Sequence, residues 1–513
     1  VEGWTIDTWK NEDLTVKVSF ELGNSASTST VTVKLINRTT GDFTDAAFDQ
    51  NGVFSTSVYN GAVSGNLYGF FRTVTLQDGD GATTESFSVS RVKLVNEDTL
   101  FPDTFTNTSG DNQWSTAANW ASGSVPTSYT DVTISSGQAI EAVSLATSAT
   151  LTLSSDASLY QGGVLTNDGQ VILNSGSAYK TSANVNGSGT FVYNQNLATT
   201  NWYIISSPIA GQDIDAFITA EPIATGSGNN MGLSTYNTAT KNWTYIQSGA
   251  SSSGNFIRGK GYAVKLSSAE AIAIAGSNPT ISNVDFTLNY NADSDGKRYN
   301  LLGNPFPSYL NTESFLGGNT SKLQTETIWV WEGDGVDDAY TTYVTAQSRK
   351  IAPVQGFFVN AVASGSGDVS FLESYQLASG NPFQGPQIDK SEVQLLISNG
   401  SNKKSTIIFY AAGTTTGFDN GWDGEIFGGQ NNDFAIYTRF INDTNPELDL
   451  AVQSLPDTSY EVPVGVNAIS GSEITISATS LDLPIDINVY LEDRENDTLT
   501  LLDDTSDYTI SLP

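Results

Sequence analysis

Acidic residues that stand two to four positions apart beside glycines are the residues of this sequence best suited to holding a metal ion. Four such stretches occur: DGDG at 78–81, DSDG at 293–296, DGVDD at 334–338 and DNGWDGE at 419–425. Loops of this composition bind calcium through carboxylate and carbonyl oxygens. The predicted calcium ligands are Asp78, Asp80, Asp419, Asp423 and Glu425. None of the stretches completes an EF-hand loop, and Asp-Gly also favours tight hairpin turns, so both interpretations stay open.

Five aromatic residues form a second candidate site, for a glycan. They are Trp202, Trp243, Trp329, Trp331 and Tyr340. Tryptophan and tyrosine combine a wide apolar face with a polar edge, which suits stacking against sugar rings. Each of the five also lies in a strand pattern, where packing in a core is the ordinary role. The solvent exposure of the tryptophans decides between the two interpretations.

The sequence lacks two of the residue types that enzymes commonly use for catalysis. The 513 residues include no cysteine and no histidine, which removes disulfides, thiol nucleophiles, thiolate metal sites and the commonest general base. Carboxylates are plentiful, but a glycosidase needs two of them at a set distance across a cleft, and the sequence marks out no pair. We therefore expect a protein that is not an enzyme, with no catalytic residue and no cofactor other than calcium.

The composition predicts strands rather than helices. Hydrophobic residues make up 38% and charged residues 15%, and glycine, serine, threonine and asparagine are abundant, which is typical of an all-β protein. The formal net charge of −33 repels phosphate, so nucleic acid is not an expected partner. No apolar run reaches the 18 or more residues of a membrane span. Such an acidic chain suits an extracellular medium, where salt screens its self-repulsion.

In the segments at both ends of the chain, apolar and polar residues alternate with a period of two. Residues 1–98 predict an Ig-like β-sandwich, with a hairpin in which 70–76 and 85–95 flank QDGDGATT. Residues 99–113 show no periodicity and predict a linker. Residues 384–513 contain seven or more alternating runs, such as EVQLLIS and STIIFYA, and predict a jelly-roll-like β-sandwich.

Two kinds of internal repeat lie between these ends. In residues 114–197 an alternating pattern recurs every 19 or 20 residues, with Val132, Leu151, Val171 and Phe191 in register. It predicts a short parallel β-solenoid, with an antiparallel meander as the alternative. Residues 198–383 are duplicated: WYIISSP matches YNLLGNPFP, GKGYAVKL matches VQGFFVNA, and Tyr236 and Trp243 match Trp331 and Tyr340. Two similar β units packed pseudo-symmetrically are expected.

The run GDNQWSTAANWASGSVPTSYTDVTI, at 110–134, resembles large secreted and surface proteins exported by the type IX secretion system of Gram-negative bacteria. The resemblance continues through WYIISSP, GKGYAVKL, YNLLGNPFPSYL and IAPVQGFFV. It ends in TTTGFDNGWDGEIFGG and DINVYLEDRENDTLTLLDDTSDYTISL, which look like the β-sandwich that commonly precedes a C-terminal sorting domain in such proteins. The sorting domain itself is not in the sequence. The resemblance implies an extracellular or cell-surface location and the type IX machinery as a partner.

Two tripeptides resemble the Asp-Ser/Thr-apolar acceptor of O-glycosylation in bacteria of this group. They are Asp98-Thr99-Leu100 and Asp497-Thr498-Leu499. The resemblance implies glycosylation of Thr99 and Thr498.

The sequence favours a non-enzymatic cell-surface scaffold, stalk or adhesin. Its expected partners are extracellular glycans or proteins, with self-association through open sheet edges as a further expectation. The alternative is a carbohydrate-binding multidomain protein associated with polysaccharide degradation, which would use the five aromatic residues.

Overall fold

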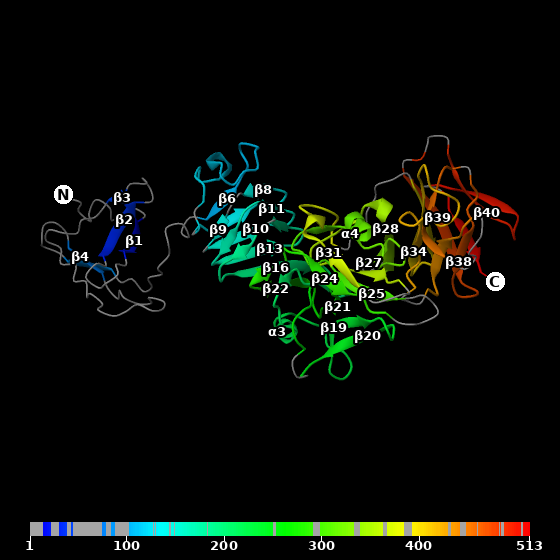
Figure 1. The fold of residues 1–513 in the computed structure, drawn as a ribbon, viewed down its shortest axis with the longest axis horizontal. Helices are drawn as coiled ribbons and strands as arrows, with labels where there is room; N and C mark the ends of the chain where they lie inside the picture. Colours follow the sequence, from blue (N-terminus) through cyan, green and yellow to red (C-terminus); the bar gives the residue numbers. More distant parts are fainter. Residues whose placement is uncertain are drawn as a thin grey trace. The chain divides into compact units, whose positions relative to one another are not determined.

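The computed structural model describes an all-β chain in two compact units, residues 1–96 and 97–513 (Figure 1). In the first unit the described residues are 14–21, 30–37, 43–44, 74–77 and 84–87. In the second they are 102–512 except for 127, 129, 143–144, 148, 182, 250–252, 291–297, 333–338, 363–366, 384–391, 429–431, 442–447, 459, 482, 484–486 and 504–505. None of the helices in these residues is long and apolar enough to cross a membrane.

The first unit contains one small sheet and one hairpin among its described residues. The strands are β1 (Leu14–Glu21), β2 (Thr30–Asn37), β3 (Phe43–Thr44), β4 (Val74–Gln77) and β5 (Thr84–Phe87). Strands β1, β2 and β3 pair antiparallel, and β4 pairs with β5 as the sequence predicts, with Val74 opposite Phe87. The predicted calcium ligands Asp78 and Asp80, together with Thr99, lie outside the described residues.

The second unit begins earlier than the sequence predicts. Strand β6 (Asp103–Phe105) pairs in parallel with β7 (Val132–Ile134). Phe105 is buried and packs edge-on against Trp120, with 5.2 Å between the ring centroids. The Asp103 carboxylate accepts hydrogen bonds from the Ser122 N–H and hydroxyl. The prediction of a linker over 99–113 is therefore wrong from residue 103 onward, because a strand of three residues is too short to show alternation.

The 19- and 20-residue repeats stack as parallel rungs. The main sheet contains β7, β10 (Thr150–Leu153), β13 (Gln170–Asn174) and β16 (Thr190–Leu197). Two further parallel sheets contain β8 (Ala139–Ala142), β11 (Ser158–Gln161) and β14 (Ala178–Thr181), and β9 (Leu145–Thr147), β12 (Leu165–Asn167) and β15 (Val185–Asn186). Val132, Leu151, Val171 and Phe191 are partners in successive strands and are all buried. Each rung therefore buries its apolar face against the next.

Residues 198–383 fold as two halves with the same strand order. The first sheet runs β17 (Trp202–Ser206), β21 (Gly261–Lys265), β19 (Asn230–Asn237), β20 (Asn242–Gln247). The second runs β25 (Tyr299–Gly303), β30 (Gly356–Asn360), β27 (Thr327–Glu332), β28 (Ala339–Val344). Each half also has one short helix, α3 (Ile214–Ala220) or α4 (Thr312–Gly318), which Asp213 and Asn311 respectively cap by accepting a backbone N–H.

Short strands surround these two sheets. They are β18 (Ile209–Ala210), β22 (Glu270–Gly276), β23 (Asn278–Pro279), β24 (Val284–Thr287), β26 (Tyr309–Asn311), β29 (Lys350–Ile351), β31 (Asp368–Phe371) and β32 (Gln376–Leu377). Strand β22 runs antiparallel to β16, so it covers the last rung of the stack and joins the stack to the duplicated segment.

The two halves meet through reciprocal contacts. The Ser206 N–H donates to the Val354 carbonyl at 2.8 Å, and the Gly303 N–H donates to the Gly259 carbonyl at 3.0 Å. Contacts that recur with the roles of the two halves exchanged define a pseudo-two-fold axis. The backbones approach so closely there that a Cβ on Gly303 would lie 2.2 Å from the Cβ of Ser206.

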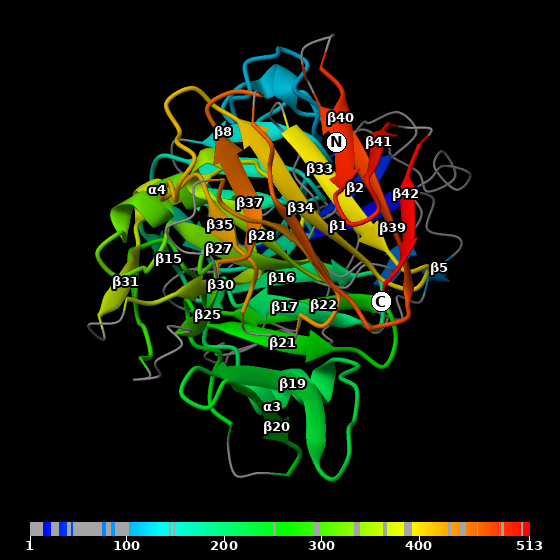
Figure 2. The same cartoon turned by 90° about the vertical axis from the view of Figure 1, so that its right-hand side faces the viewer.

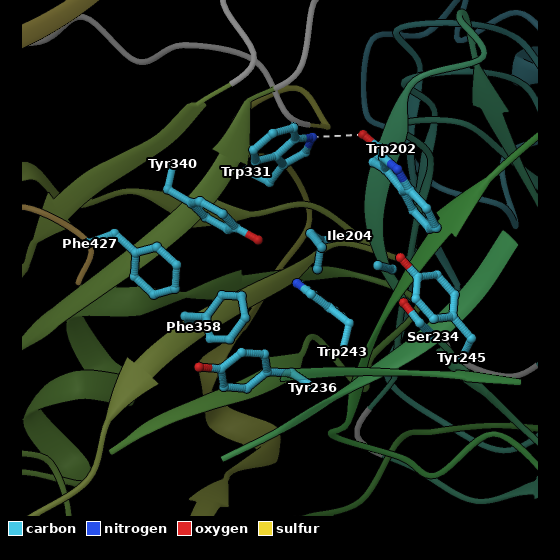
Figure 3. Close-up of a pocket in the computed structure, with 11 residues that line it drawn as sticks. Trp202, Ile204, Ser234, Tyr236, Trp243, Tyr245, Trp331, Tyr340, Phe358 and Phe427 are labelled. Carbon is cyan, nitrogen blue, oxygen red and sulfur yellow. Dashed lines mark hydrogen bonds between the residues drawn. The ribbon is translucent and has the colours of Figure 1, made fainter. Parts of the chain in front are cut away.

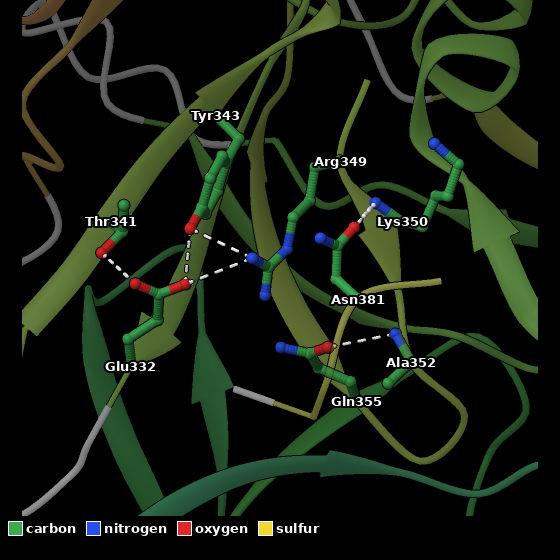
Figure 4. A network of polar contacts seen from close by, with 8 residues as sticks. All are labelled: Glu332, Thr341, Tyr343, Arg349, Lys350, Ala352, Gln355 and Asn381. Atoms are coloured by element: carbon green, nitrogen blue, oxygen red, sulfur yellow. Dashed lines mark hydrogen bonds and ion pairs between the residues drawn. The ribbon is translucent and has the colours of Figure 1, made fainter. Parts of the chain in front are cut away.

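A buried polar network stabilises the second half (Figure 4). Arg349 is fully buried, its Nη1 lies 3.5 Å from Glu332 Oε1, and it donates to the Tyr343 hydroxyl at 3.1 Å. The Tyr343 hydroxyl donates to the same carboxylate oxygen at 2.6 Å. Burial raises the pKa of Glu332, and the nearby guanidinium opposes this shift. The network ties β28 and the turn after it to β27.

The C-terminal part contains the strands that alternation predicts, and most of them form one large sheet. They are β33 (Glu392–Ser398), β34 (Lys403–Tyr410), β35 (Gly424–Glu425), β36 (Ala435–Thr438), β37 (Leu450–Leu455), β38 (Val464–Asn467), β39 (Glu473–Leu481), β40 (Val489–Asp493), β41 (Thr498–Leu502) and β42 (Tyr508–Ser511). Figure 2 shows β37, β34, β33 and β39 side by side. Among the described residues, eight strands form this sheet and β40 pairs only with β41.

Candidate functional site

An aromatic pocket of about 240 Å³ opens between the two halves of the duplicated segment (Figure 3). Strands β17, β19, β20 and β21 line it from the first half, and β27, β28 and β30 line it from the second. We call it the aromatic pocket after six of its lining residues, Trp202, Tyr236, Trp243, Tyr245, Trp331 and Tyr340.

Two cross-strand pairs, one from each half, supply four of these rings. Tyr236 on β19 is paired with Trp243 on β20, and their ring centroids are 5.5 Å apart. Trp331 on β27 is paired with Tyr340 on β28, with centroids 4.9 Å apart. These are the residues that the sequence duplication matches to one another, and paired positions in antiparallel strands share a face of the sheet.

Four of the five residues predicted for a glycan platform lie in the pocket, and Trp329 does not. Trp202, Trp243, Trp331 and Tyr340 are half-buried lining residues. The Trp329 side chain is fully buried, and its indole N–H donates to the Glu425 carbonyl at 3.1 Å. Trp329 is therefore a core residue in this structure.

The polar groups around the pocket differ in whether the protein itself uses them. The Trp331 indole N–H is used within the protein, because it donates to the Trp202 carbonyl at 2.7 Å and so holds the two halves together. In the part of the chain that the structure describes, the indole N–H groups of Trp202 and Trp243 and the hydroxyls of Tyr245 and Tyr340 have no hydrogen-bond partner. The pocket thus combines apolar ring faces with hydrogen-bonding edges.

The lining of the pocket carries no charged side chain among the described residues. Lys265 lies beside it, with Nζ 6.0 Å from the centroid of the Trp202 ring. Burial raises the pKa of the Tyr340 hydroxyl, so this group stays a neutral donor at ordinary pH. The site is therefore suited to an uncharged ligand with both apolar and hydrogen-bonding surfaces.

Sequence reasoning missed several lining residues. Tyr245 stands two positions after Trp243 on the same face of β20, so the period of two could have found it. Ser234 and Ala263 are small residues without a chemical signal of their own. Phe427 comes from the C-terminal part of the chain, and nothing in the sequence links it to residues more than 60 positions away.

The predicted calcium loop at 419–425 has its carboxylates bonded to protein groups. The buried Asp423 carboxylate accepts from the Asp419 N–H at 2.7 Å and from the Ser454 N–H and hydroxyl at 2.6 and 2.9 Å. Asp419 accepts from the N–H and hydroxyl of Thr415, and Glu425 accepts from the Tyr299 hydroxyl. No group of three or more acidic residues suited to a metal occurs within the described ranges. Calcium at this loop stays a prediction.

Comparisons with known proteins place the chain in a family. The family model described as Domain of unknown function (DUF8693) matches residues 105–511. The chain belongs to this family. No curated protein and no solved structure matches this chain. The matched residues lie inside the unit 97–513 and include the whole aromatic pocket, so the pocket is part of the family's domain.

We expect millimolar calcium to raise the melting temperature above that in chelator at matched ionic strength. An ion that binds only the folded state adds about 2.7 kcal/mol when its concentration is a hundredfold above Kd. Asp419→Ala should reduce this gain, and it is a cleaner variant than Asp423→Ala because Asp423 is buried among its own donors. Differential scanning fluorimetry checks it. Equal stabilisation by magnesium, or an unchanged gain in Asp419→Ala, would contradict calcium binding at this loop.

The second predicted glycosylation acceptor is accessible. Thr498 is the first residue of β41 and is exposed on the surface hairpin that β40 and β41 form. Its glycosylation stays a prediction.

Proposed function

We propose that this protein is a non-enzymatic extracellular or cell-surface protein, an adhesin or stalk, that binds neutral carbohydrate in the aromatic pocket. The observation that carries the proposal is the convergence of half-buried tryptophan and tyrosine rings around unpaired hydrogen-bonding groups. A sugar ring presents apolar C–H groups on its faces and hydroxyls at its edge. The pocket matches both surfaces.

The size of the pocket supports recognition of one unit within a longer glycan. Pockets that enclose drug-sized ligands measure about 300–1,000 Å³, and the aromatic pocket, at about 240 Å³, is smaller. One ring of a chain would enter it, and neighbouring sugars would extend over the rim, where Tyr245 is exposed.

The state of the buried carboxylates supports binding rather than catalysis. Burial raises the pKa of Asp423 to about 6 and also raises that of Glu332. Both groups are bonded to protein donors, and neither lines the aromatic pocket. The location outside the cell, export by the type IX machinery and a role as a scaffold rest on the sequence resemblance and the acidic composition.

The test is a glycan array followed by calorimetry on the best neutral ligand. Trp243→Ala should weaken binding about tenfold or more, since a ring contact worth about 1.4 kcal/mol corresponds to that factor. Tyr490→Ala is the matched control, because Tyr490 is an exposed aromatic residue on β40, outside the pocket.

Two results would contradict the proposal. The first is that the protein binds no neutral glycan on the array. The second is that Trp243→Ala and Tyr490→Ala weaken binding equally. Because the lining is uncharged, the affinity should also stay nearly constant between low and high salt.

A further inference from the structure

The ring of Phe427 fills a place on the second half of the duplicated segment. It follows β35 and is buried against four rings of that half, those of Tyr299, Trp329, Tyr340 and Phe358. The four centroids lie 4.7, 5.8, 4.3 and 4.8 Å, respectively, from that of Phe427. Phe427, which belongs to the C-terminal part of the chain, thus fills the space between these four rings of the second half.

The first half has an equivalent space, which we call the hollow, and no ring of the described residues fills it. The strand pairing gives the equivalents of these four residues as Trp202, Ser234, Trp243 and Ala263, and all four line the aromatic pocket. Trp329 is the partner of Phe358 across β27 and β30, and Ser234 is likewise the partner of Ala263 across β19 and β21. Two large rings are therefore replaced by two small side chains. The hollow in the first half is therefore equivalent to the space that the Phe427 ring fills in the second half.

The polar groups correspond as well. In the second half the Glu425 carbonyl accepts from the Trp329 indole N–H and from the Thr342 hydroxyl, each at 3.1 Å. Their equivalents in the first half are Ser234 and Tyr245, which are partners across β19 and β20. Both line the pocket, and neither side chain has a hydrogen-bond partner within the described residues. Two hydroxyls thus face the hollow where the other half binds a carbonyl oxygen.

From this correspondence we infer that the hollow takes a single pyranose ring, and that Ser234 and Ala263 determine specificity by keeping it open. The ring lies between Trp202 and Trp243, in the position equivalent to that of the Phe427 ring, and its hydroxyls bond Ser234 and Tyr245. This inference rests on the proposed function, since it names where the sugar sits and what admits it. An uncharged six-membered ring suits the hollow for two reasons. The side chains that line the hollow are uncharged, and the equivalent space in the second half holds the six-membered ring of Phe427.

The test fills the hollow with the residues that the second half already carries. Ser234→Trp and Ala263→Phe should each weaken the binding of cellobiose, laminaribiose, maltose or xylobiose, whichever wild type binds, about tenfold or more by calorimetry. The matched control is Thr235→Trp, which adds the same bulk to the opposite face of β19 and should bind like wild type. Ser234→Ala keeps the hollow, removes one hydroxyl, and should weaken binding only a few-fold. Circular dichroism and thermal melting establish that each variant is folded.

The outcomes separate this inference from the proposed function. If wild type binds one of the disaccharides and folded Ser234→Trp and Ala263→Phe bind it equally well, the sugar lies elsewhere and the inference alone is wrong. If wild type binds no sugar, both are wrong. A synthetic GEIFGG peptide, which carries the Phe427 segment of this chain, serves as a further probe. Binding of the peptide but of no sugar, abolished by Ser234→Trp, would replace the sugar by a protein segment and overturn the inference.

Discussion

Replacing Phe427 by alanine is expected to lower the free energy of unfolding of the unit 97–513 by about 3–5 kcal/mol, the range for phenylalanine removed from a packed core. The Phe427 side chain is 2% exposed and contacts one ring on each of four strands of the second half. The vacated volume is bounded by rigid rings, so it closes poorly and the cavity cost adds to the lost transfer free energy. Urea denaturation followed by circular dichroism measures the effect.

The control for this change is Phe418→Ala. Phe418 is 41% exposed and lies only a few residues earlier in the same part of the chain. Its removal should change the free energy of unfolding by no more than about 1 kcal/mol, as for most surface positions. Similar losses in the two variants would mean that Phe427 is not the contact that fastens the C-terminal sheet to the duplicated segment.

The sequence could predict which aromatic residues correspond in the two halves, because side chains in a strand alternate between its two faces. The match of Tyr236 and Trp243 with Trp331 and Tyr340 placed two aromatic pairs on equivalent faces, and the structure has them as cross-strand partners. The burial of Trp329 could not be predicted, since it depends on a segment almost 100 residues later in the chain that covers its face. Alternation shows which residues share a face but not what covers that face.

The alternation of apolar and polar residues could not predict the short or irregular elements. Strand β6 has three residues, and its membership in the stack depends on pairing with β7 rather than on any pattern of its own. The loop at 419–425 shows a related limit. Its Asp and Gly spacing is compatible with both a calcium site and a turn. The Asp423 carboxylate accepts from Asp419 within the loop, but its two other donors belong to Ser454, which the local sequence does not contain.

The second large effect is expected at the pseudo-two-fold axis, where Gly303→Ala should destabilise the unit by about 3 kcal/mol or more. A Cβ at this position would lie 2.2 Å from the Cβ of Ser206 and 3.0 Å from the Lys260 carbonyl oxygen. Ser206 ends β17 and Lys260 directly precedes β21, so both belong to the opposite half. The two sheets must therefore move apart, and overpacking of this kind costs about 1–3 kcal/mol or more. Gly317→Ala is the control, because this glycine lies in α4 with open space around it and alanine favours helix.

A double variant tests whether the close approach itself is the cause. Ser206 is the equivalent of Gly303 in the first half, so Ser206→Gly removes the atom that the new Cβ strikes. Ser206→Gly alone should cost about 1 kcal/mol, because the Ser206 hydroxyl donates to the Asn304 carbonyl at 2.8 Å. The double variant should then be more stable than the sum of the two single losses predicts, with a coupling of about 1–2 kcal/mol in a double-mutant cycle. Strict additivity would mean that the strain of Gly303→Ala arises elsewhere, and that the close approach of Ser206 and Gly303 does not determine how the two halves pack.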